Sequence, residues 1–380
     1  MSFNVAIRAD AAEHIGTGHV RRCQSLAAAL QRQGAKVRFV MRASRGQADP
    51  ALPDASISVL ALPAGPPAAA AQPTPQTAVD AAVAHAAVAH AGWLGTDWQT
   101  DADQTIAQLA GPPVAALIVD HYALDARWHR RVQAALQCPI IAIDDLADRP
   151  LAVDLIIDHN QATDHRLKYQ AVNQTGCQIL GGPRHALLAE RFAQAPRNLA
   201  AHPVCSIGIF MGGVDFHNLS EAAWQGLREQ AGFTGLIEIV STRASPHLER
   251  LATLRSNDAQ LQLTLDAPDL AGFFGRHELH IGAGGGATWE RCCLGAPTIA
   301  LIVADNQRQV LLPLADLQVL SLIEQERPDA ARIGRQARVM IEQAALRSQL
   351  AGNAMRLVDG LGCHRIAQHI SNLVSAPCCP

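Results

Sequence analysis

The chain has 380 residues, more than a single hydrophobic core usually organises, so its length predicts two domains. Its formal net charge of -3 excludes the concentrated positive charge that binding to nucleic acid or to a membrane surface requires. No apolar run approaches the ~20 residues that span a bilayer, and the N-terminus is typical of a strand rather than of a signal peptide. We therefore expect a cytoplasmic protein with no stable membrane insertion and no nucleic-acid partner.

Nine cysteines are present, none of them in a CxxC pair, and several lie within apolar runs. This pattern predicts reduced, buried thiols, as is usual in the cytoplasm. Cys378 and Cys379 stand just before the last residue, where they could be lipidated or ligate a metal, but a frayed tail is expected.

Short apolar runs alternate with helical patterns along most of the chain. The first run, residues 5–7, predicts a strand, and the next apolar residues share one helical face: Val20, Cys23, Leu26, Ala27 and Leu30. Gly34 closes that helix. Further strands are predicted at residues 36–41, 114–119, 140–143, 155–157, 205–210, 236–240, 279–281 and 298–303. Buried strands separated by helices predict an α/β fold built from two doubly wound parallel sheets.

The break between the two domains is predicted near residues 196–203, where a helix ends and polar residues intervene. This gives an N-terminal domain over residues 1–198, a C-terminal domain over 199–372 and a tail over 373–380. Residues 329–347 and 353–374 predict helices, and one of the two is a candidate to cross back to the first domain. Residues 61–75, rich in Pro and Ala, predict a loop, and the Ala-rich residues 78–91 predict a helix.

The loop Gly16-Thr17-Gly18-His19 follows the first strand and opens the first helix. Its glycines let backbone amides approach a ligand, and the helix start favours an anion. His19 can exchange a proton near neutral pH, although a histidine that caps or packs at the helix start remains an alternative. Asp10 follows the same strand, where it could bind substrate, orient the loop or belong to a simple turn.

A second glycine-rich turn, IGAGGGATWER, again joins a strand to a helix. Gly284 and Gly285 permit close approach of a diphosphate, Thr288 can add a hydroxyl, and Glu290 could accept hydrogen bonds from ribose. The alternative is a tight turn with a solvated glutamate. The turn lacks the Gly-Lys-Ser/Thr of a P-loop. Two such domains would face each other across a cleft lined by both turns, because ligands bind beyond the carboxyl ends of parallel strands.

Two further loops of the second domain follow predicted strands. Gly212 and Gly213, in MGGVD, are interpreted as backbone donors. Asn306, in ADNQ, offers an amide to sugar hydroxyls or acetamido groups.

Two strand ends of the first domain carry polar residues. Asp120 and Tyr122, in VDHY, lie where residues lining a cleft are found, or else Asp120 bonds a neighbouring loop. Asp144 and Asp145 could bind Mg²⁺, but a structural or sugar-binding role is favoured because no His, Cys and Asp set has metal-ligand spacing.

These segments together resemble a known family. The motifs IRAD, IGTGH, WLGxxxQxDA, VDHYALDARW, IDDLADRPL, GPRHALL, MGGVDxxNLS, GAGGGATWERCCLGAPT and ADNQ occur in the same order from about Val5 to Gln307. In this order they are similar to the PseG-type UDP-sugar hydrolases of pseudaminic acid biosynthesis.

The resemblance implies a GT-B fold, similar to that of the undecaprenyl-muramyl-pentapeptide N-acetylglucosaminyltransferase. It implies hydrolysis of UDP-2,4-diacetamido-2,4,6-trideoxy-β-L-altropyranose to UDP and the free sugar, without a metal or another cofactor. His19 then corresponds to the base that activates water, Glu290 and Asn306 to substrate ligands, and Tyr122 to a residue near the reactive centre. The chain departs from many relatives at Ala287, where they carry Ser or Thr.

Two other functions remain open. A glycosyltransferase of the same fold would direct His19 at an acceptor hydroxyl, but the apolar and basic face usual for lipid acceptors is absent from the sequence. A non-catalytic binder of nucleotide sugars would need no histidine at this loop. The sequence leaves the sugar stereochemistry open, and a monomer whose partner is a small nucleotide sugar is expected.

Overall fold

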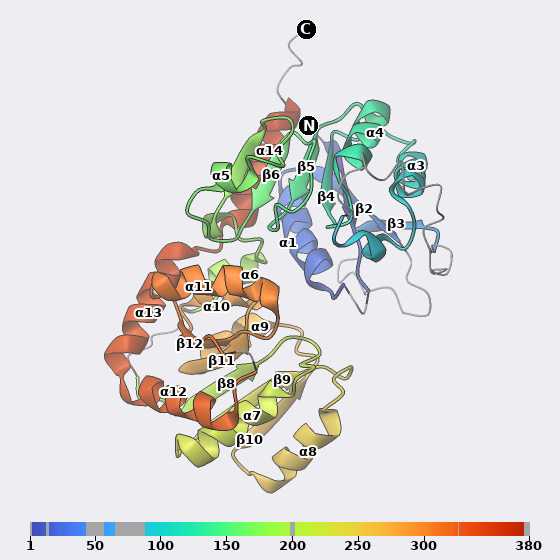
Figure 1. Ribbon diagram of the computed structural model, residues 1–380. Helices are drawn as coiled ribbons and strands as arrows, with labels where there is room; N and C mark the ends of the chain where they lie inside the picture. Colours follow the sequence, from blue (N-terminus) through green and yellow to red (C-terminus); the bar gives the residue numbers. More distant parts are fainter. Residues whose placement is uncertain are drawn as a thin grey trace, which may run out of the picture. The chain divides into compact units, whose positions relative to one another are not determined.

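The computed structural model describes residues 2–12, 15–42, 57–64, 88–197, 202–325 and 327–375, with Asn306 described by its backbone. The chain divides into two compact units, Met1–Leu187 with Gly362–Pro380, and Leu188–Leu361 (Figure 1). We call these unit 1 and unit 2. Most of the predicted loop 61–75, most of the predicted helix 78–91 and the final cysteine pair lie outside the described residues.

The described residues of unit 1 form a seven-stranded sheet in the order β3-β2-β1-β4-β5-β6-β7. Neighbouring strands are all parallel, with Val5 of β1 paired to Val37 of β2 and to Ala116 of β4. The strands are β1 (Phe3–Ala9), β2 (Ala35–Arg42), β3 (Ser58–Leu62), β4 (Ala116–Asp120), β5 (Ile140–Ile143), β6 (Leu155–Asp158) and β7 (Gln178–Gly181).

Helices cover both faces of this sheet, so unit 1 is doubly wound. Val5 and Ile7 pack on one face with α1 and α14, whereas Ala6 and Leu117 pack on the other with α3 and α4. The helices described are α1 (Gly18–Arg32), α3 (Trp98–Gln108), α4 (Ala126–Leu136), α5 (His165–Tyr169), α14 (Gly362–Ser375) and the 3-10 helices Ala91–Leu94 and Pro183–His185.

The described residues of unit 2 form a six-stranded parallel sheet in the order β10-β9-β8-β11-β12-β13. Its strands are β8 (Ser206–Phe210), β9 (Leu236–Ser241), β10 (Leu261–Leu265), β11 (Leu279–Ala283), β12 (Thr298–Leu301) and β13 (Ser321–Ile323). Its helices are α6 (Glu190–Gln194), α7 (Leu219–Gln225), the π-helix Gly226–Gln230, α8 (Leu248–Asn257), α9 (Leu270–Arg276), α10 (Gly286–Leu294), the 3-10 helix Asp305–Gln307, α11 (Arg308–Asp316), α12 (Ala330–Glu342) and α13 (Ala344–Leu357). The predicted α/β fold with two doubly wound parallel sheets is confirmed.

The division between the units falls at other residues than the predicted boundaries, 198 and 372. Helix α6 packs against α10 of unit 2, where the carbonyl of Phe192 accepts a hydrogen bond from the thiol of Cys293. Helix α14 packs against α1 and places Ile366 and Ile370 in the core of unit 1. The chain therefore crosses back to its first unit through its last helix, as the sequence suggested for one of its final helices.

The two long C-terminal helices predicted from sequence are three helices. Helix α12 ends at Glu342, and Arg347 donates to the carbonyls of Met340 (2.6 Å) and Ile341 (2.8 Å) at that end. Gly360, with φ at 80°, lies between α13 and α14 and takes the left-handed conformation that breaks a helix.

Each sheet reverses its strand order once, and this positions the candidate site. The reversal lies between β1 and β4 in unit 1 and between β8 and β11 in unit 2. In open parallel sheets ligands bind beyond the carboxyl ends of the strands at this switch point. The loops that follow β1, β4, β8 and β11 are therefore the first places to look for function. Among the described helices, none is both long enough and apolar enough to cross a membrane.

Candidate active site

His19 lies in the first turn of α1, and Asp120 is the last residue of β4, so the switch point of unit 1 brings them together. The Nδ1 atom of His19 is 2.6 Å from Oδ1 of Asp120. The carboxylate is fully buried, whereas the histidine side chain keeps 11% of its surface exposed. This geometry is that of a histidine oriented by a carboxylate, with the other ring nitrogen left for chemistry.

Arg22, one helical turn beyond His19, binds the same carboxylate. Its Nε and Nη2 atoms each lie 2.6 Å from an oxygen of Asp120. Burial alone would raise the pKa of Asp120, but the charges and hydrogen bonds of Arg22 and His19 outweigh burial and hold that pKa well below its usual range. Asp120 is therefore an anion at every pH at which the protein would work.

An anionic Asp120 decides which nitrogen of His19 carries the proton. A carboxylate can only accept, so Nδ1 of His19 must donate to it in the neutral ring. Nη2 of Arg22 also lies 3.2 Å from this nitrogen, but its shorter contact is with Asp120. The lone pair of neutral His19 is consequently on Nε2, which is the arrangement that a general base requires.

Tyr122, two residues beyond β4, presents its ring rather than its hydroxyl to His19. The two ring centroids are 4.7 Å apart in an edge-to-face arrangement. Its hydroxyl donates to Asp145, whose other carboxylate oxygen accepts from Asn160 at 3.2 Å. Burial, joined by the neighbouring carboxylates, raises the pKa of Tyr122 well above its usual range. The hydroxyl therefore stays protonated and holds the ring in place.

Two further aromatic side chains adjoin this pair. The ring of Trp93 lies 5.8 Å from that of Tyr122 and 6.2 Å from that of His19, and His90 lies 4.5 Å from Trp93. Trp93 and His90 are half-buried, so part of each ring faces solvent beside the histidine. An aromatic surface of this kind can pack against an apolar part of a ligand. We call Trp93, Tyr122 and His90 the aromatic wall.

Asp10, predicted to bind substrate or to orient the loop, lies in a buried ion network below the loop. It is 4% exposed and accepts from Nη2 of Arg8 (2.8 Å) and the backbone N–H of Arg42 (2.7 Å), while Nε2 of His121 lies 3.2 Å away. Asp101 binds the same two arginines from the far side (2.7 and 2.5 Å). These contacts engage both oxygens of Asp10 and favour the orienting role.

The described residues of the loop between β1 and α1 leave space around two glycines. Gly16 has φ at 78°, a left-handed conformation that favours glycine. A side chain placed on Gly16 or Gly18 would meet no atom within 4 Å. The first N–H groups of α1, beside His19, have no acceptor within the helix itself and are available to a ligand.

The second glycine turn joins β11 to α10 at the switch point of unit 2. Gly285 has φ at 102°, and α10 begins at Gly286. Both glycines are exposed, and a side chain on either would meet nothing within 4 Å. Gly284 is more closely packed, since a side chain added there would lie 3.1 Å from Gln307. Free N–H groups at the start of a helix make a site for an anion.

Three residues predicted near this turn differ in how they are placed. Thr288 is fully buried, and its hydroxyl oxygen lies 3.4 Å from Nη2 of the buried Arg291, so it faces the interior of the unit. Glu290 is half-buried on α10. Asn306 lies in the 3-10 helix Asp305–Gln307, which follows β12, the strand next to β11.

The loop after β8 carries Gly212 and Gly213, which the sequence predicts to be backbone donors. Gly212 has φ at 93°, and Gly213 accepts at its carbonyl a hydrogen bond from the hydroxyl of Thr242. The carboxylate of Asp215 receives the N–H groups of Leu219 and Ser220 at 2.9 Å and so caps α7. Since β8 and β11 are neighbours in the sheet, this loop adjoins the second glycine turn.

The paired acids after β5 have protein partners. Asp144 binds Arg149 at 2.6 Å, and Tyr169 donates to it at 3.0 Å, whereas Asp145 binds Tyr122. In the part of the chain that the structure describes, no three His, Cys, Asp or Glu side chains are grouped as ligands of a metal ion.

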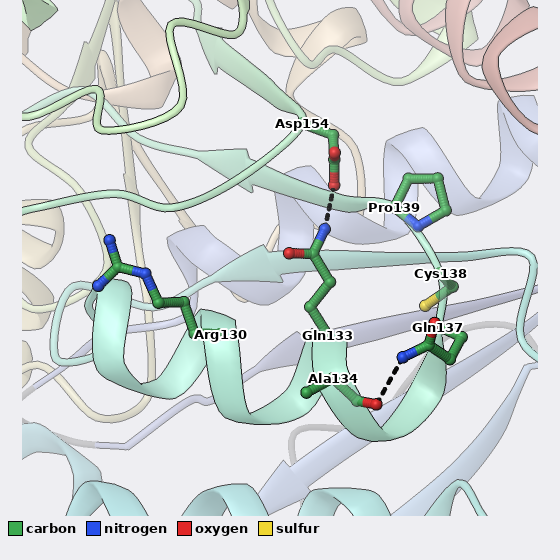
Figure 2. A pocket seen from close by; sticks show the side chains of 7 residues that line it. All are labelled: Arg130, Gln133, Ala134, Gln137, Cys138, Pro139 and Asp154. Carbon is green, nitrogen blue, oxygen red and sulfur yellow. Dashed lines mark hydrogen bonds between the residues drawn. The ribbon is translucent and has the colours of Figure 1, made fainter.

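A separate hollow of about 510 Å³ lies at the opposite edge of the sheet of unit 1 (Figure 2). Pro139 and Asp154 in its lining precede β5 and β6, so it opens at the amino ends of the strands. There Gln133 donates to Asp154 at 2.8 Å, and Gln137 donates to the carbonyl of Ala134 at 2.7 Å (Figure 2). The chemistry described above lies at the carboxyl ends, so this hollow is not the candidate active site.

The sequence indicated His19, Asp120 and Tyr122 but assigned no role to Arg22, His90 or Trp93. Arg22 could have been found from the sequence, because it stands three residues after His19 and residues at this spacing share one face of a helix. Trp93 stands in the WLG motif, but only the fold brings it to His19.

No protein-family model matches the chain, and no curated relative matches its sequence. Its fold is nevertheless shared with solved structures. MurG of Acinetobacter baumannii superposes with a TM-score of 0.65 at 14% identity, over 97% of this chain and 99% of that one. A UDP-glucosyltransferase from Polygonum tinctorium that glucosylates indoxyl gives 0.65 at 13% identity, over 99% of both chains.

A third match is a spinosyn rhamnosyltransferase complexed with thymidine diphosphate, with a TM-score of 0.63 at 16% identity, over 97% of this chain and 100% of that one. The chain has the GT-B fold. The expected architecture is thereby confirmed. At such low sequence identities the similarity establishes the fold and nothing about activity.

Proposed function

We propose that the protein is an enzyme that hydrolyses a UDP-linked 2,4-diacetamido-2,4,6-trideoxy sugar to UDP and the free sugar, in the cytoplasm and on the route to pseudaminic acid. The observation that carries the catalytic part is the contact of 2.6 Å between His19 and the buried, anionic Asp120. The ordered sequence motifs support the choice of substrate. The GT-B fold supports it further, since its carriers named above include a UDP-glucosyltransferase.

The reaction would proceed by direct displacement. Nε2 of His19 accepts a proton from water as the water oxygen attacks the anomeric carbon of the sugar. The bond between that carbon and the diphosphate oxygen breaks, and UDP departs with both electrons of the bond. The imidazolium formed on His19 is stabilised by Asp120, to which its Nδ1–H already donates.

Unit 2 would hold the nucleotide in this proposal. The N–H groups of Gly285 and Gly286, at the start of α10, suit the diphosphate, where they would also stabilise the charge that grows on the leaving group. Glu290 and Asn306 are assigned to ribose and sugar contacts, Gly212 and Gly213 to backbone donors. The inward hydroxyl of Thr288 argues against its predicted phosphate contact.

Unit 1 would hold the sugar and the water. The aromatic wall offers an apolar surface beside His19 for the C6 methyl group and the acetamido methyl groups of the sugar. The amides of Gly16 and Gly18 could receive an anion or a carbonyl oxygen. Asp10 would keep its place in the ion network and position the loop from below.

The deciding experiment follows UDP-linked diacetamido sugars by NMR with no acceptor present. Release of free sugar supports hydrolysis. In H₂¹⁸O, displacement at carbon puts the label in the sugar and leaves UDP unlabelled, so label in UDP would refute the mechanism. His19→Ala should lower turnover about 10²–10⁴-fold with UDP affinity unchanged, whereas Glu290→Ala should weaken UDP binding measured by calorimetry.

A glycosyltransferase is the second candidate, because the solved structures with this fold are named as transferases. His19 would then accept a proton from an acceptor hydroxyl instead of water. UDP-sugar that stays intact without an acceptor, and is consumed once candidate acceptors are added, would favour this function. UDP-sugar that binds and is never consumed would favour a non-catalytic binder.

A further inference from the structure

Arg291 is a buried cation directly beneath the glycine turn of unit 2. It is 1% exposed, and its Nη2 donates to the carbonyl of Ala283, the last residue of β11, at 2.8 Å. Its guanidinium carbon lies 5.7 Å from the ring centroid of Phe274. The charge is thus held between an aromatic ring and the backbone that leads into the open glycines.

The charge of Arg291 lacks an ion-pair partner among the described residues. Its Nε is buried without a hydrogen-bond partner, and Glu290, its neighbour in sequence, acts on it only electrostatically. Burial lowers the pKa of Arg291 to about 10, so it remains charged at neutral pH. A buried charge without an ion-pair partner is destabilising, and a ligand anion would offset that cost.

The first glycine of the motif makes room for this charge. A side chain on Gly282 would lie 2.5 Å from Nη1 of Arg291 and 2.6 Å from the carbonyl of Phe210. Glycine is therefore required here by the backbone carbonyl, which cannot move aside, as well as by the guanidinium. Gly285 and Gly286, in contrast, have open space above them. The turn therefore carries backbone N–H groups on its exposed side, and the buried cation Arg291 lies on its inner side.

We propose that Arg291 is a positioning residue that supplies the buried counter-charge of the anion site at Gly285 and Gly286, and so selects a ligand with a diphosphate. This rests on the assignment of that turn to the nucleotide. Arg291 touches no ligand in this arrangement. It acts through the turn that it supports, by orienting the carbonyl of Ala283 inward and by adding positive potential to the N–H groups.

The test compares UDP, inorganic pyrophosphate and uridine as probes of the full chain, by calorimetry at pH 7. Arg291→Gln should weaken UDP and pyrophosphate about tenfold or more, equivalent to 1.4 kcal/mol, and leave uridine unaffected. Arg347→Gln is the matched control: Arg347 is also 1% exposed, and it donates to the carbonyl of His202 at 2.7 Å, before β8 at the amino edge of the sheet. This control should leave all three affinities unchanged.

Arg291→Lys keeps the proposal testable if the glutamine variant does not fold. A buried lysine loses its proton at a lower pH than arginine. UDP affinity of the lysine variant should therefore match the wild type at pH 7 and fall below it as the pH rises to 9. The proposal would be overturned if Arg291→Gln weakened the affinities for UDP and uridine equally. It would also be overturned if the UDP affinity of Arg291→Lys matched that of the wild type up to pH 9.

The outcome is separate from that of the proposed function. Phosphate-selective binding that depends on Arg291, in a protein that hydrolyses no UDP-sugar, would refute the hydrolase and support the counter-charge. Hydrolysis that persists in Arg291→Gln with unchanged UDP affinity would refute the counter-charge and support the hydrolase.

Discussion

Replacing Asp120 by asparagine tests the catalytic pair with a change of one atom. In the unsubstituted protein the carboxylate of Asp120 accepts a hydrogen bond from Nδ1 of His19, but the amide of an asparagine can donate its own N–H to that nitrogen. The neutral ring would then carry its proton on Nε2 and lose the lone pair that faces the substrate. In serine proteases the equivalent change in the aspartate that orients the catalytic histidine costs about 10⁴-fold in turnover, so we expect a loss of 10²-fold to about 10⁴-fold here.

The same substitution also removes the main partner of Arg22. Breaking a buried ion pair costs about 3–5 kcal/mol. We expect the lower end, because Arg22 keeps 14% of its side chain exposed and lies 3.8 Å from Asp145. For a unit of this size, about 3 kcal/mol lowers the melting temperature by roughly 6–12 °C. The variant should therefore stay folded at 20 °C, where its activity can be measured.

Asp103→Asn provides the matched control. Asp103 binds Arg131 at 2.7 Å on the surface, with 55% of its side chain exposed, and such pairs contribute about 0–1 kcal/mol. Turnover of a UDP-diacetamido sugar, UDP affinity and thermal unfolding are measured for both variants. Asp120→Asn should lose turnover and keep its UDP affinity, and Asp103→Asn should change neither. A folded Asp120→Asn protein with near-normal turnover would refute the role of the pair.

Three more substitutions test other parts of the structure. Trp93→Ala should raise KM for the diacetamido sugar nucleotide without weakening UDP, whereas the half-buried Trp98→Ala should leave KM unchanged. Gly282→Ala should lower the melting temperature, because its methyl group would lie 2.6 Å from the backbone carbonyl of Phe210 and 2.5 Å from Arg291; an unchanged melting temperature would contradict that packing. Although burial opposes it, hydrogen bonds from His277, Arg276 and Thr264 lower the pKa of Glu238 to about 2. The stabilising contribution of Glu238 is therefore complete above about pH 4.5 and is lost toward pH 2. Glu238→Gln should lower the free energy of unfolding in urea by up to about 3 kcal/mol at pH 7. This loss should become progressively smaller below pH 4.5.

The sequence predicts the strands that lie inside each sheet and misses those at the edges. Strands β3, β7, β10 and β13 were not predicted, and they are the four edge strands. An interior strand is covered on both faces and appears as a continuous apolar run, such as Ile140–Ile143. Edge strands such as β10, with the sequence LQLTL, are partly exposed and carry polar residues, so their runs are broken.

The candidate site was predictable where a motif follows an interior strand. His19, Tyr122 and the glycine turns stand at strand ends, and the two switch points bring these ends together within each unit. The partners of these residues are set by contacts between distant parts of the chain. The helical spacing places Arg22 on the same face as His19, but its binding of Asp120, like the meeting of Trp93 with Tyr122, joins residues far apart in the sequence.

The glycine run of unit 2 shows why residue type alone does not assign a role. As a sequence, the glycines from Gly282 to Gly286 predict one phosphate-binding feature. In the structure, Gly282 leaves space for a guanidinium, Gly284 packs against Gln307, and the positive φ of Gly285 turns the strand into the helix. Among the described glycines of this run, Gly285 and Gly286 are the ones with space for a ligand. A substitution at Gly286 therefore tests anion binding, whereas one at Gly282 tests the packing around the buried charge.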